Sequence, residues 1–261
     1  MRNIKQVLLV ALGVMLFASC ASEQKDEQSG SMPEFEELTF KTPSDSNFNI
    51  NIVYQHIVNT AESDIFAAIE ESNLELTLPR EGSDVEADAN FEERAEALLQ
   101  TIIDDGFDAY DLDLVQTAFL TRNNATLCYA TSCYTYMGGA HGYGTLHYTC
   151  YDLASGQMYD FRYLNEGEWD TELRMLIYNK LREVYSESEL FITPDKIYVP
   201  ESVLLTDVGL LLTYQPYEIA PYSTGIVQVE LTDEDIAATG APLLWVAEAE
   251  WHMMPENELK H

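Results

Sequence analysis

Residues 126–152, TLCYATSCYTYMGGAHGYGTLHYTCYD, hold the pattern that decides the fold. Two stretches rich in Thr, Tyr and Cys, 126–137 and 146–152, flank the glycine-dense segment 138–144. β-branched and aromatic residues favour strands, and glycine permits the backbone conformations that a tight connection needs. The sequence therefore predicts an antiparallel β-hairpin with its connection at 138–144.

Around this hairpin the chain holds blocks of strand pattern and blocks of helix pattern. Apolar side chains at every second position from 48 to 54 predict a half-buried strand over 47–59. Further strands are expected at 35–42, 114–120, 158–161, 203–206, 210–214 and 226–231. Helices are expected at 61–72, 91–104 and 168–186, with a short helix opened by Thr232. Strands and helices therefore occur in blocks and do not alternate strictly along the chain. This order predicts an α+β fold, with antiparallel sheets that each pack against helices.

The N-terminus has the pattern of a targeting segment. Arg2 and Lys5 precede an apolar run of 11 residues, 7–17, and small residues then lead into Cys20. The run is too short to span a bilayer, and this order is typical of a bacterial lipoprotein signal. An ordinary secretory signal with a chance cysteine is the alternative. We therefore expect a signal peptide at 1–19 and a lipid on Cys20, which becomes the mature N-terminus.

Behind this signal the chain is expected to divide into three parts. Residues 20–34 are polar and lack periodicity, which predicts a flexible tether. An N-terminal α+β domain is expected over 35–156 and a C-terminal α+β domain over 157–261. The acidic residues that follow Cys20 resemble a surface-export signal of certain bacterial lipoproteins. We therefore expect an extracytoplasmic protein that is lipid-anchored to the bacterial membrane, with the outer membrane favoured, and that faces either the periplasm or the cell surface.

The charge of the chain is strongly one-sided. Its 261 residues carry 13 Lys and Arg against 45 Asp and Glu, a formal net charge of −32. An apolar content of 46% is enough for a core, so the charge indicates an acidic folded domain and not an unfolded polyanion. Removal of residues 1–19 takes away two bases and no acid, which leaves 11 bases, 45 acids and a balance of −34. Such a surface repels phosphate, which excludes nucleic acid as a partner, and it favours a basic partner.

Residues 81–113 concentrate this charge, with 12 acids and Arg94 as the one base. Asn90 and Glu93 form the pattern of a capping box, so the helix at 91–104 is expected to begin after Asn90. Clustered carboxylates suit calcium, but their spacing does not match an EF-hand loop. A solvated acidic face is the favoured interpretation, and a calcium site is the alternative.

Three cysteines remain if Cys20 is lipidated. They include no C-x-x-C pair and no histidines at metal spacing, so no metal site is predicted. A hairpin centred near His141 places Cys133 opposite Cys150 and leaves Cys128 several residues from any partner. Cys133 and Cys150 are therefore the candidate disulfide. Three buried thiols that pack as small apolar side chains are the alternative.

The sequence contains no recognisable catalytic motif. A G-x-S-x-G elbow, an H-E-x-x-H helix and a P-loop are all absent. His141 and His147 flank the hairpin connection, but no third ligand at a fixed spacing accompanies them. We therefore expect a protein that is not an enzyme and needs no cofactor or metal, and no catalytic residue is assigned.

Two features are more specific: the glycine-dense connection, and a run of eight tyrosines between positions 129 and 163. Glycine lets a backbone approach a ligand closely, and tyrosine combines a flat apolar face with a hydroxyl, which suits proteins and sugars. The alternative is a structural turn beside tyrosines that pack within a sheet. The candidate partner surface consists of Tyr136, Gly138, Gly139, His141, Tyr143, Tyr217, Glu218 and Tyr222.

Pro216 and Pro221 fix φ and lack a backbone donor, so residues 217–222 must leave the preceding strand as an ordered loop. Such a loop forms either a recognition surface or a plug over the core. An exposed Glu218 beside the neighbouring tyrosines indicates recognition, whereas a buried Glu218 bonded to main-chain donors indicates a structural role. Because Ile219 is apolar, we expect the buried, structural Glu218.

Two separated motifs resemble a known family. Residues 137–142 (MGGAHG) and 151–157 (YDLASGQ) form the first, and residues 204–225 (LLTDVGLLLTYQPYEIAPYSTG) form the second. Together they resemble the extracytoplasmic domains of the RsiV-like family, which also occur in PdaC-like proteins. The resemblance covers residues 36–255 and is weakest at 79–111.

The resemblance implies a two-part α+β ectodomain with a binding role. Members occur as the outer domain of an anti-sigma factor that binds lysozyme, beside polysaccharide-deacetylase domains, and as lipoproteins of unknown function. We expect neither transmembrane signalling nor deacetylation here, because this sequence shows no spanning helix and no deacetylase domain. The resemblance and the acidic charge together favour a membrane-anchored envelope protein that binds a lysozyme-like muramidase. A peptidoglycan- or polysaccharide-binding module and an uncharacterised envelope hydrolase are the alternatives.

Overall fold

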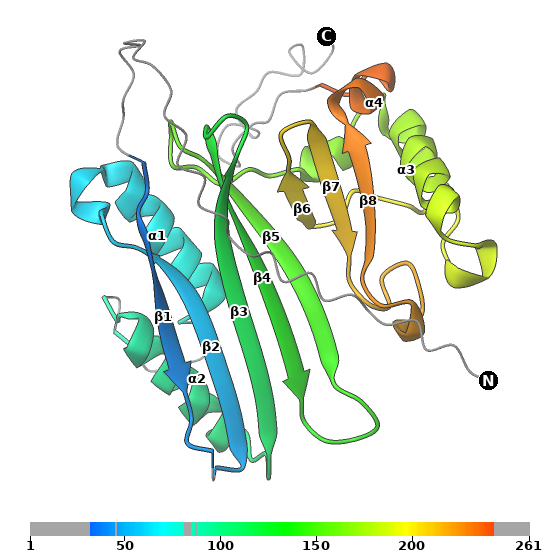
Figure 1. The fold of residues 1–261 in the computed structure, drawn as a ribbon. Coiled ribbons are helices and arrows are strands. Elements are labelled where there is room, and N and C mark those ends of the chain that lie inside the picture. Colours follow the sequence, from blue (N-terminus) through cyan, green and yellow to red (C-terminus); the bar gives the residue numbers. More distant parts are fainter. Residues whose placement is uncertain (1–31, 45, 81–84, 87, 243–261) are drawn as a thin grey trace, which may run out of the picture. The chain divides into compact units, whose positions relative to one another are not determined.

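The predicted hairpin forms two neighbouring strands of a five-stranded sheet (Figure 1). A computed structural model describes residues 32–44, 46–80, 85–86 and 88–242, so the signal peptide, Cys20 and most of the tether lie outside the described residues. The strands are β1 (Phe35–Lys41), β2 (Phe48–Ile57), β3 (Tyr110–Thr121), β4 (Thr126–Tyr136) and β5 (Tyr143–Asp152). They lie side by side in chain order, which makes β5 an edge of this sheet.

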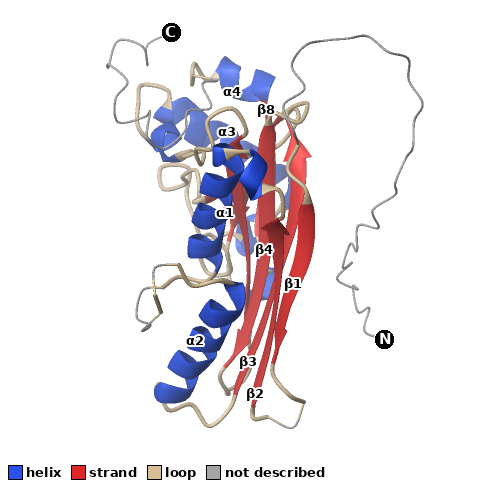
Figure 2. Ribbon diagram, turned by 90° about the vertical axis from the view of Figure 1, so that its left-hand side faces the viewer, coloured by secondary structure: helices blue, strands red, loops and turns tan. Residues whose placement is uncertain are grey.

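One pair of strands is parallel, which corrects the expectation of purely antiparallel sheets. β2 and β3 run in the same direction, whereas the other three pairs are antiparallel. Their long connection holds α1 (Asp64–Thr77) and α2 (Phe91–Asp104) and returns the chain to the end of the sheet where β2 began. Both helices cover one face of the sheet (Figure 2).

The local patterns that define α2 and β2 are confirmed. The Asn90 side chain accepts from the Glu93 backbone at 3.1 Å, and Glu93 accepts from the Asn90 backbone at 2.8 Å, which completes the predicted capping box. The apolar side of β2 is buried, because Ile50, Ile52 and Tyr54 are all 0% exposed. Phe91 of α2 stacks on Tyr54, so the amphipathic helix covers the apolar strand face that the alternation predicts.

A second, three-stranded sheet is fully antiparallel. It consists of β6 (Ser202–Leu205), β7 (Gly209–Tyr214) and β8 (Val227–Thr232). α3 (Asp170–Val184) packs on β8, and α4 (Asp233–Ala238) follows β8 with the capping box of Thr232 and Asp235. The strand predicted at 158–161 is reduced to a single bridge between Tyr151 and Met158. Short 3₁₀ helices occupy Thr60–Glu62, Arg162–Asn165, Glu187–Glu189 and Tyr222–Thr224.

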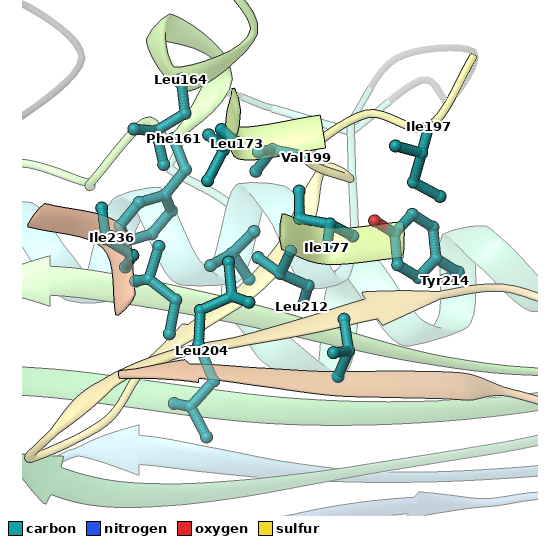
Figure 3. Packing of buried hydrophobic residues seen from close by; sticks show 14 of the residues in the cluster. Phe161, Leu164, Leu173, Ile177, Ile197, Val199, Leu204, Leu212, Tyr214 and Ile236 are labelled. Carbon is teal, nitrogen blue, oxygen red and sulfur yellow. The ribbon is translucent and has the colours of Figure 1, made fainter. Parts of the chain in front are cut away.

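The α+β expectation is therefore confirmed, and the largest core joins the two sheets. α3 contributes Leu173 and Ile177 to this core, and β7 contributes Leu212 (Figure 3). Cys128 and Cys150, from β4 and β5, belong to the same cluster. The described residues from Met32 to Pro242 belong to one compact unit. The predicted domain boundary, between residues 156 and 157, falls between the two sheets. The division of the chain into two domains at this point stays a prediction.

The hairpin register shows that the predicted disulfide pair is wrong. Cys133 lies opposite Thr145, and Cys150 lies opposite Cys128. The pairing of Thr135 with Tyr143 centres the hairpin on Gly139. A pairing of Cys133 with Cys150 would need a centre between His141 and Gly142, so the observed centre at Gly139 moves every cross-strand partner by five positions.

The start of the folded chain is held by Asn59. Its side chain donates to the Met32 carbonyl at 2.9 Å and accepts from the Glu34 backbone at 2.9 Å. The predicted tether is therefore too long at its C-terminal end, because residues 32–34 are already fixed to the domain. Among the described residues, no helix has the length and apolar character needed to span a membrane.

A buried arginine joins α1 to α2. The Arg94 side chain is 4% exposed, and its guanidinium donates to Glu75 at 2.8 Å, to the Leu78 carbonyl at 3.2 Å and to the Ala89 carbonyl at 3.1 Å. Arg80 binds the same Glu75 carboxylate at 2.7 Å, but its side chain is 30% exposed. The two arginines therefore share one carboxylate, but only Arg94 is buried, and its guanidinium also binds the Leu78 and Ala89 carbonyls.

Arg94→Gln should lower the free energy of unfolding by about 3 kcal/mol, because it leaves two buried carbonyls and part of a carboxylate without their donor. Arg80→Gln should cost less than about 1 kcal/mol, since water replaces the lost partner. Urea denaturation of both variants checks this difference. Equal losses would show that Arg94 does not hold the two helices together.

Candidate functional site

The candidate site begins with a clamp on the edge of β5. The Gln215 side chain accepts from the Leu146 N–H at 3.0 Å and donates to the Leu146 carbonyl at 2.8 Å. Ser202 accepts from the Tyr148 N–H at 3.1 Å and also donates to the Leu146 carbonyl, at 3.0 Å. These two side chains supply hydrogen bonds that a neighbouring strand would otherwise give. They thereby fix the start of the loop after β7 against the hairpin.

The clamp brings the two predicted motifs into contact. The Tyr222 hydroxyl donates to the Gly142 carbonyl at 2.7 Å, and the Tyr143 hydroxyl donates to the Pro216 carbonyl at 3.2 Å. The His141 ring stacks on Tyr222 with centroids 4.0 Å apart and an interplanar angle of 21°. Each motif therefore holds the backbone of the other through a tyrosine hydroxyl.

The stack continues to Tyr217, whose ring lies 5.7 Å from that of Tyr222 at an angle of 29°. Tyr217 is 54% exposed and Tyr143 is 38% exposed, so this cluster lies at the surface. We call the group of His141, Tyr143, Tyr217, Glu218 and Tyr222 the aromatic surface.

The hairpin tip beside the aromatic surface contains the other predicted residues. Gly138 and Gly139 have φ of +93° and +98°, a region that side-chain-bearing residues rarely adopt. The Tyr136 hydroxyl donates to the Gly139 carbonyl at 3.0 Å and braces the turn. The His141 Nδ1 lies 2.9 Å from the Gly142 carbonyl, so Nδ1 carries the proton of this bond. Both glycines and His141 are exposed, so the tip is open to a partner.

The loop after β7 has an unusual backbone at Tyr217. Its φ is +76°, although tyrosine has a Cβ that disfavours this region. Two main-chain bonds hold the turn, from the Tyr217 N–H to the Ala220 carbonyl and from the Glu218 N–H to the Gln215 carbonyl, both 3.1 Å. The chain leaves β7 at Tyr214, as the two prolines predict. Strain held by surrounding structure is frequent at functional sites.

Glu218 has the main-chain hydrogen bond expected for a structural role and the exposure expected for recognition. Its carboxylate accepts from the Gln215 N–H at 2.6 Å, which is the expected main-chain partner. The residue is nevertheless exposed, so the expected burial is wrong: Ile219, 0% exposed, fills the core, and the turn directs Glu218 outward. Partial removal from water raises the pKa of Glu218, the Gln215 N–H opposes this, and the nearby Glu201 carboxylate raises the pKa further.

The aromatic surface is built from segments without positive side chains. Residues 123–161 and 197–242 contain no Lys or Arg. Elsewhere, at least six of the nine described bases pair with a carboxylate, which leaves little free positive charge to balance the surface. The carboxylates of Glu201 and Glu218 therefore act in a negative environment that favours a cationic partner.

A separate cleft of about 620 Å³ lies beside α1, and the sequence does not predict it. Its floor is polar, with Thr131 of β4 and Thr145, His147 and Thr149 of β5. Burial lowers the pKa of His147, while Glu201 raises it. The lining includes none of the aromatic-surface residues, so the two histidines of the sequence analysis belong to different sites.

The cleft wall carries an ion pair between Asp160 and Arg162, which are 2.7 Å apart. In the part of the chain that the structure describes, no group of three or more His, Cys, Asp and Glu side chains is arranged to hold a metal ion. The described residues of the acidic segment 81–113 therefore provide no cluster of ligands for the alternative calcium site.

Comparisons with known proteins agree on the fold. A protein from Bacteroides fragilis described as a member of the DUF3298 family has a similar structure, with a TM-score of 0.60 and 15% identity over 78% of this chain and 92% of its own. A DUF3298 family protein from Pseudomonas aeruginosa is also similar, with a TM-score of 0.54 and 16% identity over 79% of this chain and 94% of its own. At these identities the likeness shows a shared fold.

The sequence comparison is more local. Residues 164–234 match the family model described as a protein of unknown function, DUF3298, and this match runs from before α3 into α4. It therefore includes the second of the two motifs, residues 204–225, and the loop of the aromatic surface. None of the curated proteins compared with the chain matches it.

The unusual φ of Tyr217 gives a prediction about stability. Tyr217→Gly and Tyr217→Ala both remove the ring, but only alanine keeps the Cβ that disfavours a positive φ. The glycine variant should therefore be more stable than the alanine variant by about 1 kcal/mol. Chemical denaturation of the two proteins measures this difference directly. An alanine variant as stable as the glycine variant would mean that Tyr217 is not strained.

Proposed function

We propose that this protein is a lipid-anchored binding protein of the bacterial cell envelope, and that its aromatic surface docks a basic protein of the lysozyme-like muramidase class. The observation that carries the proposal is the convergence of two distant motifs. The hydrogen-bonded residues of the hairpin tip and the loop after β7 are 73 to 80 positions apart in the chain, yet they form one exposed surface of stacked rings with the Glu218 carboxylate beside them.

The side chains of this surface suit a protein partner. Tyrosine supplies a large rigid contact area at low entropic cost, and it is enriched at the energetic centres of interfaces. A ring face such as that of Tyr217 also attracts Lys and Arg of a partner, and the Glu218 carboxylate beside it adds a charge for the same group. A standard interface covers about 800 Å² per partner, so a docked protein would also contact residues around the aromatic surface, such as Glu201, whose charge acts on Glu218.

The charge of the whole molecule supports the same class of partner. The mature chain carries a balance of −34, and the segments of the aromatic surface contain no base. Such a field speeds the encounter with a basic protein and discriminates against acidic ones. Because exposed charges are screened over about 8 Å at physiological ionic strength, this contribution depends on salt.

The family resemblance adds independent support. The second motif, 204–225, lies within the region matched by the DUF3298 model, and it resembles a family with a lysozyme-binding member. The two DUF3298 proteins share the fold of this chain, and a DUF3298 match is compatible with that resemblance. We propose a binding role without catalysis, because the aromatic surface offers recognition groups and no paired nucleophile and base.

Capture experiments with a basic lysozyme test the proposal. We expect the mature domain to retain lysozyme at roughly 50 mM salt and to lose at least tenfold in affinity at roughly 300 mM. Tyr217→Ala and Glu218→Gln should each weaken binding by about tenfold, as central contacts do. Glu230→Gln, an exposed β8 variant with the same change in net charge, is the control and should bind normally.

Two results would contradict this proposal. Binding that is equally weak for Glu230→Gln and Glu218→Gln would show that net charge alone attracts lysozyme. Binding that survives loss of both Tyr217 and Glu218 would place the contact elsewhere on the molecule.

The anchor has its own test. If Cys20 carries the lipid, Cys20→Ala should move the protein from the membrane fraction to the soluble fraction, because no acyl chain remains to insert. Fractionation followed by immunoblotting measures this, and a membrane-bound Cys20→Ala protein would contradict lipid anchoring.

A second candidate function rests on the threonine-lined cleft. Its volume lies in the usual range for small-ligand sites, and its floor of hydroxyls and one imidazole suits a neutral, hydroxyl-rich ligand such as a cell-wall glycan. Binding of a neutral glycan should change little between the two salt concentrations, which separates this candidate from protein capture.

A further inference from the structure

We infer that Cys128 and Cys150 form a disulfide that links β4 to β5 in the native protein. The two residues lie directly opposite each other in the antiparallel pair, and their Sγ atoms are 2.7 Å apart. Residues opposite each other in such a pair have Cα atoms about 4.5–5.5 Å apart, which is within the range that a disulfide spans. Both cysteines are free thiols in the structure, and the two strands hold their sulfurs close enough for a small side-chain movement to join them.

The third cysteine cannot compete for either partner. Cys133 lies five positions along β4 from Cys128, a distance of roughly 17 Å in an extended strand, and a disulfide needs Cα atoms within about 7 Å. Five positions also place its side chain on the opposite face of the sheet, because neighbouring residues alternate between faces. Cys133 and Cys150 both border the cleft, but only Cys128 and Cys150 belong to the core shared by the two sheets.

The surroundings of the pair favour a linked form over two thiols. Cys128 is 0% exposed and Cys150 is 2% exposed. Their other contacts with the protein are long: Cys128 Sγ is 3.6 Å from the Thr121 hydroxyl and 3.8 Å from the Leu205 carbonyl, and Cys150 Sγ is 3.9 Å from the Val203 carbonyl. The Leu205 N–H donates to Cys150 Sγ at 3.4 Å, a bond that a disulfide sulfur can also accept. The link would therefore keep the contact with β6.

The chemistry requires an oxidant, which we take to be a disulfide such as that of an oxidised dithiol oxidoreductase or of oxidised glutathione. One cysteine thiolate attacks this disulfide and displaces one of its sulfurs as a thiol, forming a mixed disulfide. The other cysteine then attacks the mixed disulfide, the Cys128–Cys150 bond forms, and the second sulfur of the oxidant leaves as a thiol. Two electrons and two protons pass from the cysteines to the oxidant.

This exchange must precede complete folding. Thiolate is the reactive form, and burial raises the pKa of Cys150 well above its ordinary value in the folded protein. The hairpin alone brings the cysteines together, and β6 with the rest of the shared core covers them afterwards. The inference therefore predicts rapid oxidation during refolding and slow oxidation of the folded, reduced protein.

Thiol counting tests the inference in the full chain with Cys20→Ser, which leaves three cysteines. The protein is refolded with a mixture of reduced and oxidised glutathione, then denatured in guanidinium with maleimide. We expect one maleimide per chain without reductant and three after reduction, with an intact mass about 2 Da lower before reduction, since two hydrogens are lost. This test does not depend on the location or the partner proposed above.

A matched variant identifies the linked pair. Adding Cys133→Ser should give no maleimide without reductant and two after reduction. Two maleimides without reductant in this variant would overturn the inference. That result would mean that Cys128 and Cys150 stay free, or that one of them pairs with Cys133 when Cys133 is present. Reduction of this variant should also lower the Tm by about 10 °C, because a loop closed over 22 residues is released. An unchanged Tm would contradict a link in the folded protein.

Discussion

The pairing of the Gln215 amide with the Leu146 backbone is the interaction on which the proposed site depends. β5 is the edge of the five-stranded sheet, and an edge strand exposes backbone groups that must find partners. Gln215 satisfies both groups of Leu146, and Ser202 adds a second pair of bonds. The Gln215 amide thus satisfies one position of the exposed edge and fixes the loop after β7 beside the hairpin tip.

Several features of the aromatic surface follow from that attachment. With the loop fixed at Gln215, Tyr222 reaches the Gly142 carbonyl and Tyr143 reaches the Pro216 carbonyl, so each segment limits the motion of the other. Rings held in this way lose little entropy when a partner binds. The positive φ of Tyr217 costs stability, and the outward Glu218 places a carboxylate next to the rings. Both features oppose a purely structural role for the loop.

Local sequence patterns predicted the helices and strands well, but they did not predict how residues far apart in the chain pair with one another. The capping box of Asn90 and the alternation in β2 depend on near neighbours, so their sequence signals are complete. The centre of the hairpin at Gly139, the parallel pairing of β2 with β3 and the Gln215 clamp depend on residues far apart, and no local spacing encodes them. Glycine, proline and tyrosine patterns indicate the residues of the candidate surface, and its two halves, the hairpin tip and the loop after β7, do meet. The individual contacts between these halves have no signal in the sequence.

Amide hydrogen exchange in the Gln215→Leu variant tests most directly whether the clamp creates the site. Leucine has a similar size but cannot pair with Leu146, so the account predicts faster exchange at 143–148 and 217–225. Exchange in β2 and β3 should stay unchanged, which separates local opening from general destabilisation. Unchanged protection at both 143–148 and 217–225 would contradict the claim that Gln215 joins the hairpin and the loop into one surface.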